Sequence, residues 1–416
     1  MRKWITPLLL FAGAFLATLL LQQYTFVYQE FEGLFLATPD YFSQVFRGPF
    51  PISGIVADFL TQFFRIGGFA PSIVAAGVVL SFLLVRRILG RFSLGWDIPA
   101  AVAACALWVV AAFASTAKPG VAMVLILSLL WLLSRLLPKR ETRPLKPGID
   151  LTVSALLIAG VFLFLSLNGR IRHWEKTSAL RVAVTQADWN RVLEIATPEA
   201  SAQDPTMMPF AFLALGEKGL LGQTLYDYPI ESEADFDLVG IEDSHLTLFF
   251  KAFLYETLSC PNEAIHNLAQ LVTTQRHGQS FLVLRRLMQD NYLIGNYDLV
   301  EKYARILSRS TLHQKHVRYY RDLMAKGTPH VPDSVGFRKT VPLITHNPLY
   351  NLSMLQANGI NAPAAVDRTL CTLLLQNDLP RFRTLFFQVW DKSRPIPRYY
   401  GEALLMDDGD YLPETK

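Results

Sequence analysis

Apolar positions are concentrated in the first 168 residues, where five long apolar runs occur. A helix needs about 20 mostly apolar residues to cross the roughly 30 Å hydrocarbon core, because its backbone polar groups must bond within the segment. We expect spans at Ile5–Phe26, Phe69–Leu89, Ile98–Ser115, Val121–Leu137 and Leu151–Leu167. The pattern therefore predicts an all-α protein, with a transmembrane bundle of about five spans over 1–168 and a second domain over 169–416.

Two of these runs need comment. The first is longer than the apolar region of a signal peptide and continues into Gln22–Tyr28, so we interpret it as an uncleaved helix. The third is rich in alanine and only moderately hydrophobic, which favours close packing against neighbouring helices through small residues. If the third run does not span, the number of crossings becomes even.

Lysine and arginine residues predict the orientation. Five spans place Arg2, Lys3, the segment Arg86–Arg91 and the segment Arg135–Lys146 on one side, and basic short loops usually stay cytoplasmic. We therefore expect a cytoplasmic N-terminus, with the loop 29–68 and the C-terminal domain on the opposite, periplasmic side. The basic cluster Arg170–Lys176 argues against this, and an even number of spans would leave the C-terminal domain in the cytoplasm.

The external loop 29–68 contains a short amphipathic pattern at Pro51–Arg65, where apolar residues recur at spacings of three and four. A helix of this length is too short to span. It lies either in the interfacial plane or over the mouth of the bundle, or else it is a short core helix of a compact loop.

The C-terminal domain carries helical periodicity and little strand-like alternation. Apolar residues follow helical spacing at Trp174–Gln186, Trp189–Ala196, Pro209–Lys218, His245–Leu258, Glu263–Thr274, Ser280–Tyr292, Tyr297–Ser308, Gln314–Lys326, Leu349–Asn358, Ala364–Asn377 and Phe382–Trp390. A stretch rich in proline and glycine near 326–342 predicts a break between two helical regions.

A weak repeat is present in these helices. Similar turn-then-helix stretches begin at Ala187, Asn262, Asn296 and Asn377, and Pro261 and Asn296 are 35 positions apart. Gly295–Asp298 resembles the turn of tetratricopeptide repeats, in which glycine permits the turn and Asn or Asp caps the next helix. The full tetratricopeptide signature is absent, so the prediction is a tetratricopeptide-like solenoid or a more general helical solenoid. Stacked hairpins of this kind suit the binding of peptides or partner helices.

Three carboxylates of the first loop are the candidates for catalysis: Glu30, Glu32 and Asp40. Multi-spanning transferases of lipid-linked sugars place a catalytic carboxylate in their first external loop. The three carboxylates resemble that residue in their position along the chain only. Asp40 is the best single candidate under that interpretation. Ordinary solvated loop charges are the simpler interpretation of the three residues.

Histidine and cysteine residues offer little further chemistry. His313 and His316 have the spacing of a shared metal site, but no third ligand stands nearby and a surface pair is the simpler interpretation. Cys105 lies in an apolar run. Cys260 and Cys371 would pair only if the fold brought them together, and Cys371 has the surroundings of a small buried hydrophobic residue.

Several classes of function are excluded by the sequence. The net charge of +4 comes largely from basic residues beside membrane helices, and no basic stripe interleaved with aromatic residues indicates nucleic-acid binding. The phosphate-binding and dinucleotide-binding glycine motifs are absent, as is the nucleophile motif Gly-x-Ser-x-Gly. We expect no nucleotide, cofactor or metal, and the lipid bilayer and a partner protein remain as partners.

The chain also resembles a known family. The resemblance rests on Tyr41–Gln44, Gly48–Phe50, Ile55–Phe64, Ala214–Gly219, Gly295–Tyr297 and Pro397–Leu405. These segments are similar to membrane proteins of Bacteroidota grouped as family 6057 of the domains of unknown function. The resemblance implies the inner membrane of a Gram-negative bacterium and carries no activity.

The sequence thus predicts an integral inner-membrane protein that acts as a non-enzymatic scaffold through its C-terminal domain. The alternative is an envelope enzyme of the lipid-linked sugar transferase type that uses the first external loop. A transporter is disfavoured because few ionisable residues lie within the apolar runs.

Overall fold

The computed structural model describes residues 4–92, 97–114, 116–136, 147–238, 244–274, 280–310, 312–326, 347–359 and 362–406, and within them it contains helices and no strand. The chain divides into two compact units. Unit 1 comprises residues 1–179 with 309–312, and unit 2 comprises residues 180–308 with 313–416. The predicted proline-rich break near 326–342 lies almost wholly outside the described residues.

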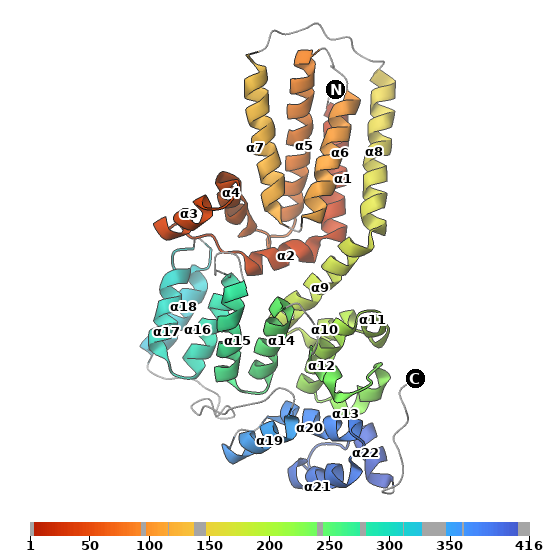
Figure 1. The fold of residues 1–416 in the computed structure, drawn as a ribbon, viewed down its shortest axis with the longest axis vertical. Helices are drawn as coiled ribbons and strands as arrows, with labels where there is room; N and C mark the ends of the chain where they lie inside the picture. Colours follow the sequence, from red (N-terminus) through yellow and green to blue (C-terminus); the bar gives the residue numbers. More distant parts are fainter. Residues whose placement is uncertain are drawn as a thin grey trace. The chain divides into compact units, whose positions relative to one another are not determined.

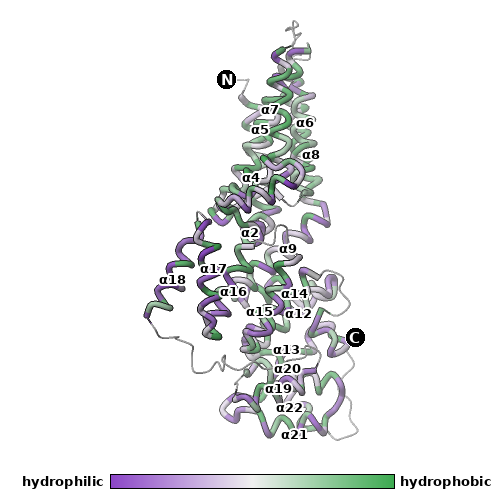
Figure 2. Tube along the Cα trace, turned by 60° about the vertical axis from the view of Figure 1, so that its left-hand side comes forward, coloured by the Kyte–Doolittle hydropathy of each residue, from purple (hydrophilic) through white to green (hydrophobic). Residues whose placement is uncertain are grey.

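Unit 1 is built from helices of very different length. They are α1 (Ile5–Leu21), α2 (Gln23–Glu32), α3 (Pro39–Phe46), α4 (Pro51–Thr61), α5 (Phe69–Leu89), η2 (Gly90–Phe92), α6 (Asp97–Phe113), α7 (Ala117–Ser134), α8 (Pro147–Leu167) and the first part of α9 (Gly169–Thr185). Figure 1 shows α1, α5, α6, α7 and α8 side by side as a bundle, and Figure 2 shows that α5 to α8 are coloured largely hydrophobic.

Three of these helices are long and apolar enough to cross a membrane: α5 continued through η2, α7 and α8. A fourth is added if α1 and α2, which meet at a bend of 72°, form one broken span. The prediction of a single helix over Ile5–Phe26 is therefore wrong, because α1 ends at Leu21. The third run folds as α6, whose 17 residues make it shorter than the other candidates.

Helix α6 packs as its alanine content predicted. Ala100, Ala101 and Ala104 are completely buried, and Trp108 and Ala112 continue the same buried face. Small side chains let neighbouring backbones approach closely, and α6 contacts α5, α7 and α8. The prediction that this run packs through small residues is confirmed.

The predicted amphipathic helix of the first loop forms as α4. Its buried face consists of small residues such as Gly54 and Ala57, while Ile52, Val56 and Phe59 are exposed. These three apolar side chains therefore lie off the packed face of α4. Phe35 packs edge to face against both Tyr41 of α3 and Phe59, with ring centroids 5.4 and 5.5 Å apart, which joins the two short helices.

Unit 2 begins within α9 and continues through many short helices. They are α10 (Trp189–Ile195), α11 (Pro198–Gln203), η3 (Pro205–Met207), α12 (Met208–Glu217), α13 (Leu221–Thr224), η4 (Leu225–Asp227), η5 (Glu233–Phe236), α14 (Ser244–Thr257), α15 (Pro261–Thr274), α16 (Phe281–Leu293), α17 (Tyr297–Leu307), α18 (Gln314–Ala325), α19 (Pro348–Ala357), α20 (Pro363–Leu375), α21 (Leu379–Val389) and α22 (Arg398–Leu405). Each helical stretch predicted for the C-terminal domain corresponds to one of these helices or to α9. The short helices α11, α13 and α22 were not predicted.

Consecutive helices from α14 to α18 pack each against the next, and Figure 1 shows them as a row. The preceding part of the unit centres on α12, which is buried from Met208 to Leu215 and contacts α10, α14 and α20. Phe210 packs edge to face against Phe250 of α14, with ring centroids 5.2 Å apart. This aromatic contact joins the row of helices to the rest of unit 2.

One type of turn recurs between helices of unit 2. Its first residue has a positive φ and the next residue precedes a new helix, as at Gly295 (φ 77°), Gly219 (φ 64°), Ser259 (φ 59°), Asn377 (φ 55°) and Ala187 (φ 54°). In each turn, the residue after the positive-φ residue donates its backbone N–H to a carbonyl oxygen of the preceding helix, five positions earlier, at 2.8–2.9 Å. This is the Schellman type of helix ending, which satisfies the last carbonyl groups.

The predicted turn at Gly295 is therefore present, with one difference. Asn296 occupies the cap position of α17, but its side chain makes no capping hydrogen bond. Asp188 and Asp378 at the equivalent positions do cap the next helix, by accepting from Arg191 N and Arg381 N.

Candidate functional site

The bend between α1 and α2 is fixed by two polar contacts from distant parts of unit 1. Gln22 lies at the bend, and its Nε2 donates to the carbonyl oxygen of Ala112 near the end of α6, at 2.9 Å. Gln22 is only 5% exposed, so this hydrogen bond is shielded from water. It ties the end of α1 to α6.

Glu175 of α9 caps the first turn of α2. One carboxylate oxygen accepts from the backbone N–H of Tyr24 at 2.8 Å, and the other accepts from the N–H and the hydroxyl of Thr25, both at 2.9 Å. The first N–H groups of a helix have no partner within it, and a negative charge there also interacts favourably with the helix dipole. Glu175 therefore stabilises the start of a helix at the bend.

An apolar cavity of about 300 Å³ lies beside this bend, enclosed by α4, α5, α6 and α7. This volume is at the lower limit of the range typical of ligand pockets. Its walls include Phe26, Phe64, Leu60, Val78 and Trp108, and the few polar members, such as Gln22 and Ser81, lie among them.

The cavity exists because small residues stand where helices face one another. Gly77 of α5 and Gly120 of α7 both line it. A Cβ atom at Gly77 would meet nothing within 4 Å, and one at Gly120 would meet only the Cβ of Ala111, at 3.9 Å. Larger side chains at these positions would fill the cavity, so its size is set by residues of the lining itself.

The three candidate carboxylates do not line this cavity. Glu30 is buried in α2, 5% exposed, and accepts a hydrogen bond from the backbone N–H of Arg65 at 2.6 Å. Glu32 is half-buried at the end of the same helix, and Asp40 is exposed in the first turn of α3. Glu30 thus fixes the chain after α4, while Asp40 stays accessible to solvent.

A fourth carboxylate of the loop, Asp58, was not predicted. Its Oδ2 accepts a hydrogen bond from the hydroxyl of Tyr41 at 2.6 Å, which joins α4 to α3. Burial, and then the bond to Asp58, raise the pKa of Tyr41 well above its usual range, so this hydroxyl keeps its proton. The sequence pattern alone gives no sign of this partner, because Tyr41 lies 17 positions earlier in another helix.

Unit 2 contains a buried cluster of charges on α14 and α16. Arg286 donates to Glu256 at 3.0 Å and to the carbonyl oxygen of Thr185 at 2.7 Å, and its guanidinium lies over the ring of Phe253. Asp290, one turn further along α16, is 1% exposed, and neither of its carboxylate oxygens has a hydrogen-bond partner among the described residues. This cluster fixes α16 against α14 and the end of α9.

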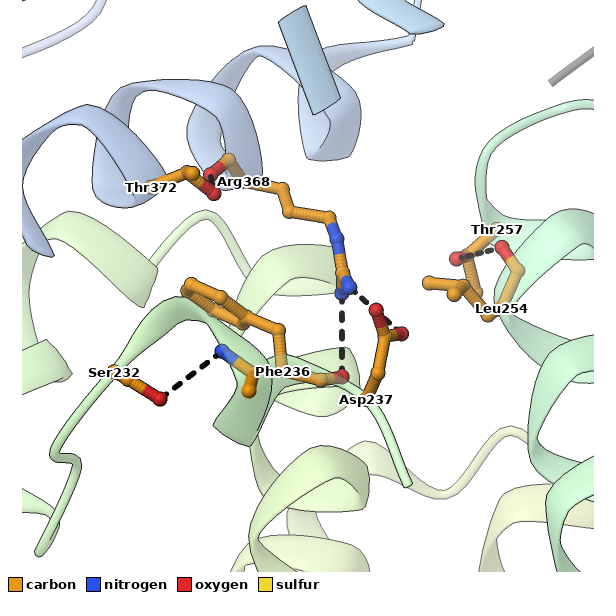
Figure 3. A network of polar contacts seen from close by, with 8 residues as sticks. Ser232, Phe236, Asp237, Leu254, Thr257, Arg368 and Thr372 are labelled. Carbon is orange, nitrogen blue, oxygen red and sulfur yellow. Dashed lines mark hydrogen bonds and ion pairs between the residues drawn. The ribbon is translucent and has the colours of Figure 1, made fainter. Parts of the chain in front are cut away.

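A second arginine joins α20 to the segment before α14. Arg368 donates to Asp237 at 2.9 Å and to the carbonyl oxygen of Phe236 at 3.5 Å, while its guanidinium lies 4.9 Å from the centre of the Phe236 ring. Figure 3 shows Arg368 reaching from its helix to these two residues. The side chain forms a structural clamp between distant segments.

The hydroxyl of Tyr400 lies in a comparable buried cluster. It donates to Asp367, whose other carboxylate oxygen accepts from Arg394 at 3.0 Å, and it lies 3.3 Å from the sulfur of Cys371. Burial raises the pKa of the Cys371 thiol far above its usual range, so this cysteine stays protonated and unreactive. The prediction that Cys371 is a buried small residue is confirmed, and Cys260 is a separate buried thiol.

The prediction of a surface histidine pair is wrong. His313 is buried and its ring stacks on Phe281, with centroids 3.6 Å apart, while the His316 ring lies 5.6 Å from the same phenylalanine. Within the described residues, no three histidine, cysteine, aspartate or glutamate side chains are grouped as metal ligands.

Comparison with known proteins gives one result. The model of a family described as a family of unknown function, DUF6057, matches residues 1–172 and 172–411. No curated protein and no solved structure matches the chain.

Proposed function

Because the chain belongs to the family of unknown function DUF6057, from which no activity can be transferred, we propose a function from its structure. The protein is a membrane-anchored, non-enzymatic scaffold whose second unit binds a partner protein. Its helical bundle holds it in the inner membrane of a Gram-negative cell, and its second unit lies in the periplasm. The three to four helices able to cross a membrane support the anchoring part of this proposal.

The single observation that carries the scaffold proposal is the recurring turn of unit 2. Five connections of the same geometry join consecutive helices, at Ala187, Gly219, Ser259, Gly295 and Asn377. Repeated helix pairs that pack mainly on their neighbours are typical of tetratricopeptide-like solenoids, which act by presenting an extended binding surface. In the described part of unit 2, the charged clusters around Arg286 and Arg368 are buried and bridge helices, which favours a structural role for them.

The outer faces of α15 and α17 offer the surface for a partner. Helix α16 between them is almost wholly buried, whereas His266 and Gln270 of α15 and Asp298, Lys302 and Arg305 of α17 are exposed. A polar and charged surface of this kind suits a partner that associates reversibly, because non-obligate interfaces are no more apolar than the rest of a protein surface.

Photo-crosslinking of the full-length protein in cells tests this proposal. A photoreactive amino acid placed at Gln270 or at Lys302 is expected to give an adduct of the same mass with one protein. The matched control is the exposed Ser353 of α19, which is expected to give none. Absence of an adduct at both test positions, or equal adducts at the control, would reject the scaffold function.

The second candidate function is an envelope enzyme that handles a lipid-linked sugar. It is favoured by one observation, the apolar cavity next to the first loop, and weakened by the absence of the carboxylates from its lining. Asp40 is exposed and would have to carry the chemistry, so Asp40→Asn should alter envelope glycans if this candidate is correct. Unchanged glycans in that variant, and in Glu30→Gln, would remove it.

A further inference from the structure

Two side chains that line the apolar cavity of unit 1 are also exposed. Leu80 of α5 and Leu125 of α7 both line the cavity, and they are 43% and 39% exposed. Both helices are long and apolar enough to span. Exposed side chains of membrane-spanning helices face hydrocarbon rather than water, so the exposure of these two leucines favours access to the cavity from the bilayer.

The shape and chemistry of the cavity select an apolar chain. Nearly all of its lining residues are aliphatic, aromatic, alanine or glycine. The side-chain amide of Gln22, one of the few polar groups, already donates a hydrogen bond to the carbonyl oxygen of Ala112. Ligand sites that recognise a polar group place several converging donors or acceptors in an apolar wall. This cavity offers a slot for hydrocarbon instead.

A cation lies at the α4 side of the same cavity. Lys118 is the second residue of α7, between lining residues Ala117 and Gly120, and its Nζ would lie 3.6 Å from a Cβ atom built at Gly54 of α4. No carboxylate of the described residues pairs with Lys118. Near the end of a span, an ammonium group reaches the level of lipid phosphates.

Helix α4 carries side chains suited to that same level. Ile52 and Phe59 are exposed, as is Phe50 immediately before the helix, while its small-residue face is packed on unit 1. A short helix with exposed apolar groups beside basic residues such as Arg47 and Arg65 lies favourably at the boundary between headgroups and acyl chains. The apolar slot, the cation and the interfacial helix are thus adjacent parts of one arrangement.

We propose that unit 1 binds one phospholipid with an anionic headgroup, inserting an acyl chain between α5 and α7 while Lys118 pairs with the phosphate. The lipid comes from the surrounding bilayer and stays intact. This binding site is separate from the partner-binding surface of unit 2, so either proposal can fail without the other.

Native mass spectrometry of the full-length protein tests the proposal, after purification in a mild detergent and exposure to phosphatidylglycerol or phosphatidylcholine. Wild type is expected to retain one phosphatidylglycerol in preference to phosphatidylcholine. Gly77→Leu fills the cavity and should reduce that retention roughly tenfold or more, since the leucine occupies the volume needed by the chain. Gly120→Leu fills it from the facing helix and should do the same.

The matched control is Gly160→Leu in α8. A Cβ at Gly160 also meets nothing within 4 Å, but this glycine does not line the cavity, so lipid retention should match wild type. Lys118→Gln should keep a bound lipid and lose the preference for phosphatidylglycerol.

Equal retention in wild type and in both filling variants, at unchanged thermal stability, would overturn the cavity as the site. An unchanged headgroup preference in Lys118→Gln would overturn the role of the cation.

Discussion

At the scale of single residues, Asp290 makes stability depend on pH. Burial first, and then the negative charge of Glu256, raise its pKa well above the ordinary value of 3.8, while Arg286 opposes the shift. The folded state therefore binds this proton more tightly than the unfolded state. The resulting stabilisation is fully present below 3.8 and is lost as the pH rises through the folded pKa.

Asp290→Asn is accordingly expected to flatten the decline in melting temperature with rising pH and to stabilise the folded protein at neutral pH. A buried polar group without a hydrogen-bond partner typically costs about 1–3 kcal/mol, and a charged one costs more. Melting temperatures of the detergent-solubilised protein, measured from below pH 3.8 to neutral pH, test this expectation. Asp298→Asn on exposed α17 serves as control, and an equal response of the two variants would contradict the assignment.

A second prediction at this scale concerns the recurring turns. Ala187 and Gly295 occupy equivalent positive-φ positions, but alanine in this conformation costs about 1–2 kcal/mol that glycine avoids. Ala187→Gly should therefore stabilise unit 2 by up to about 1 kcal/mol, and Gly295→Ala should destabilise it by a similar amount. A Cβ at Gly295 meets nothing within 4 Å, so its cost is conformational alone. Melting temperatures that shift in the same direction in both variants would show that the turns are not equivalent.

At the scale of helices, the start of α2 depends on Glu175. Glu175→Ala removes three hydrogen bonds to one carboxylate, and bonds to a charged group contribute about 1.5–3 kcal/mol. We expect faster hydrogen exchange at the backbone amides of Tyr24 and Thr25, together with a lower melting temperature. Glu194→Ala removes a carboxylate from an exposed pair with Arg191 and should change neither. Unchanged exchange at Tyr24 and Thr25 would contradict the cap.

The helices were predictable from sequence to different degrees, for physical reasons. The long helices of unit 2 follow from apolar spacing, which is a local property. The bend at Gln22 does not, because its hydrogen bond reaches 90 positions to Ala112 and the cap on α2 comes from about 150 positions away. The face that α4 buries was also unpredictable, since Gly54 and Ala57 give no hydrophobic signal yet permit the closest approach.

At the scale of the whole molecule, the resemblance to DUF6057 is confirmed by the family match, which carries no information on the source organism. The candidate site was only partly predictable from the sequence. Glu30, Glu32 and Asp40 were chosen by position along the chain, and the structure places them in different environments on α2 and α3. The cavity arises from glycine and alanine residues on three helices. A cavity of this kind cannot be predicted from the sequence, because a single glycine in an apolar run does not show which residues of other helices will face it.

The number of crossings determines which compartment holds each part of the protein. Helix α6 has 17 residues, about 25 Å at 1.5 Å per residue, which is short for a span. However, its buried residues extend from Ala100 to Ala112 between α5, α7 and α8, so it runs through the bundle along nearly its full length. We therefore predict that α6 crosses the membrane together with its neighbours. The crossing helices are then α1, α5, α6, α7 and α8, which is an odd number.

Thiol labelling in spheroplasts tests this count. Ser43→Cys in α3 and Ser353→Cys in α19 place exposed thiols in the first loop and in unit 2, while the native cysteines are buried. With five crossings, a membrane-impermeant maleimide should label both engineered thiols from outside the inner membrane. If only the thiol at Ser43 reacts, four helices cross and unit 2 is cytoplasmic. The partner of unit 2 would then have to be sought among cytoplasmic proteins.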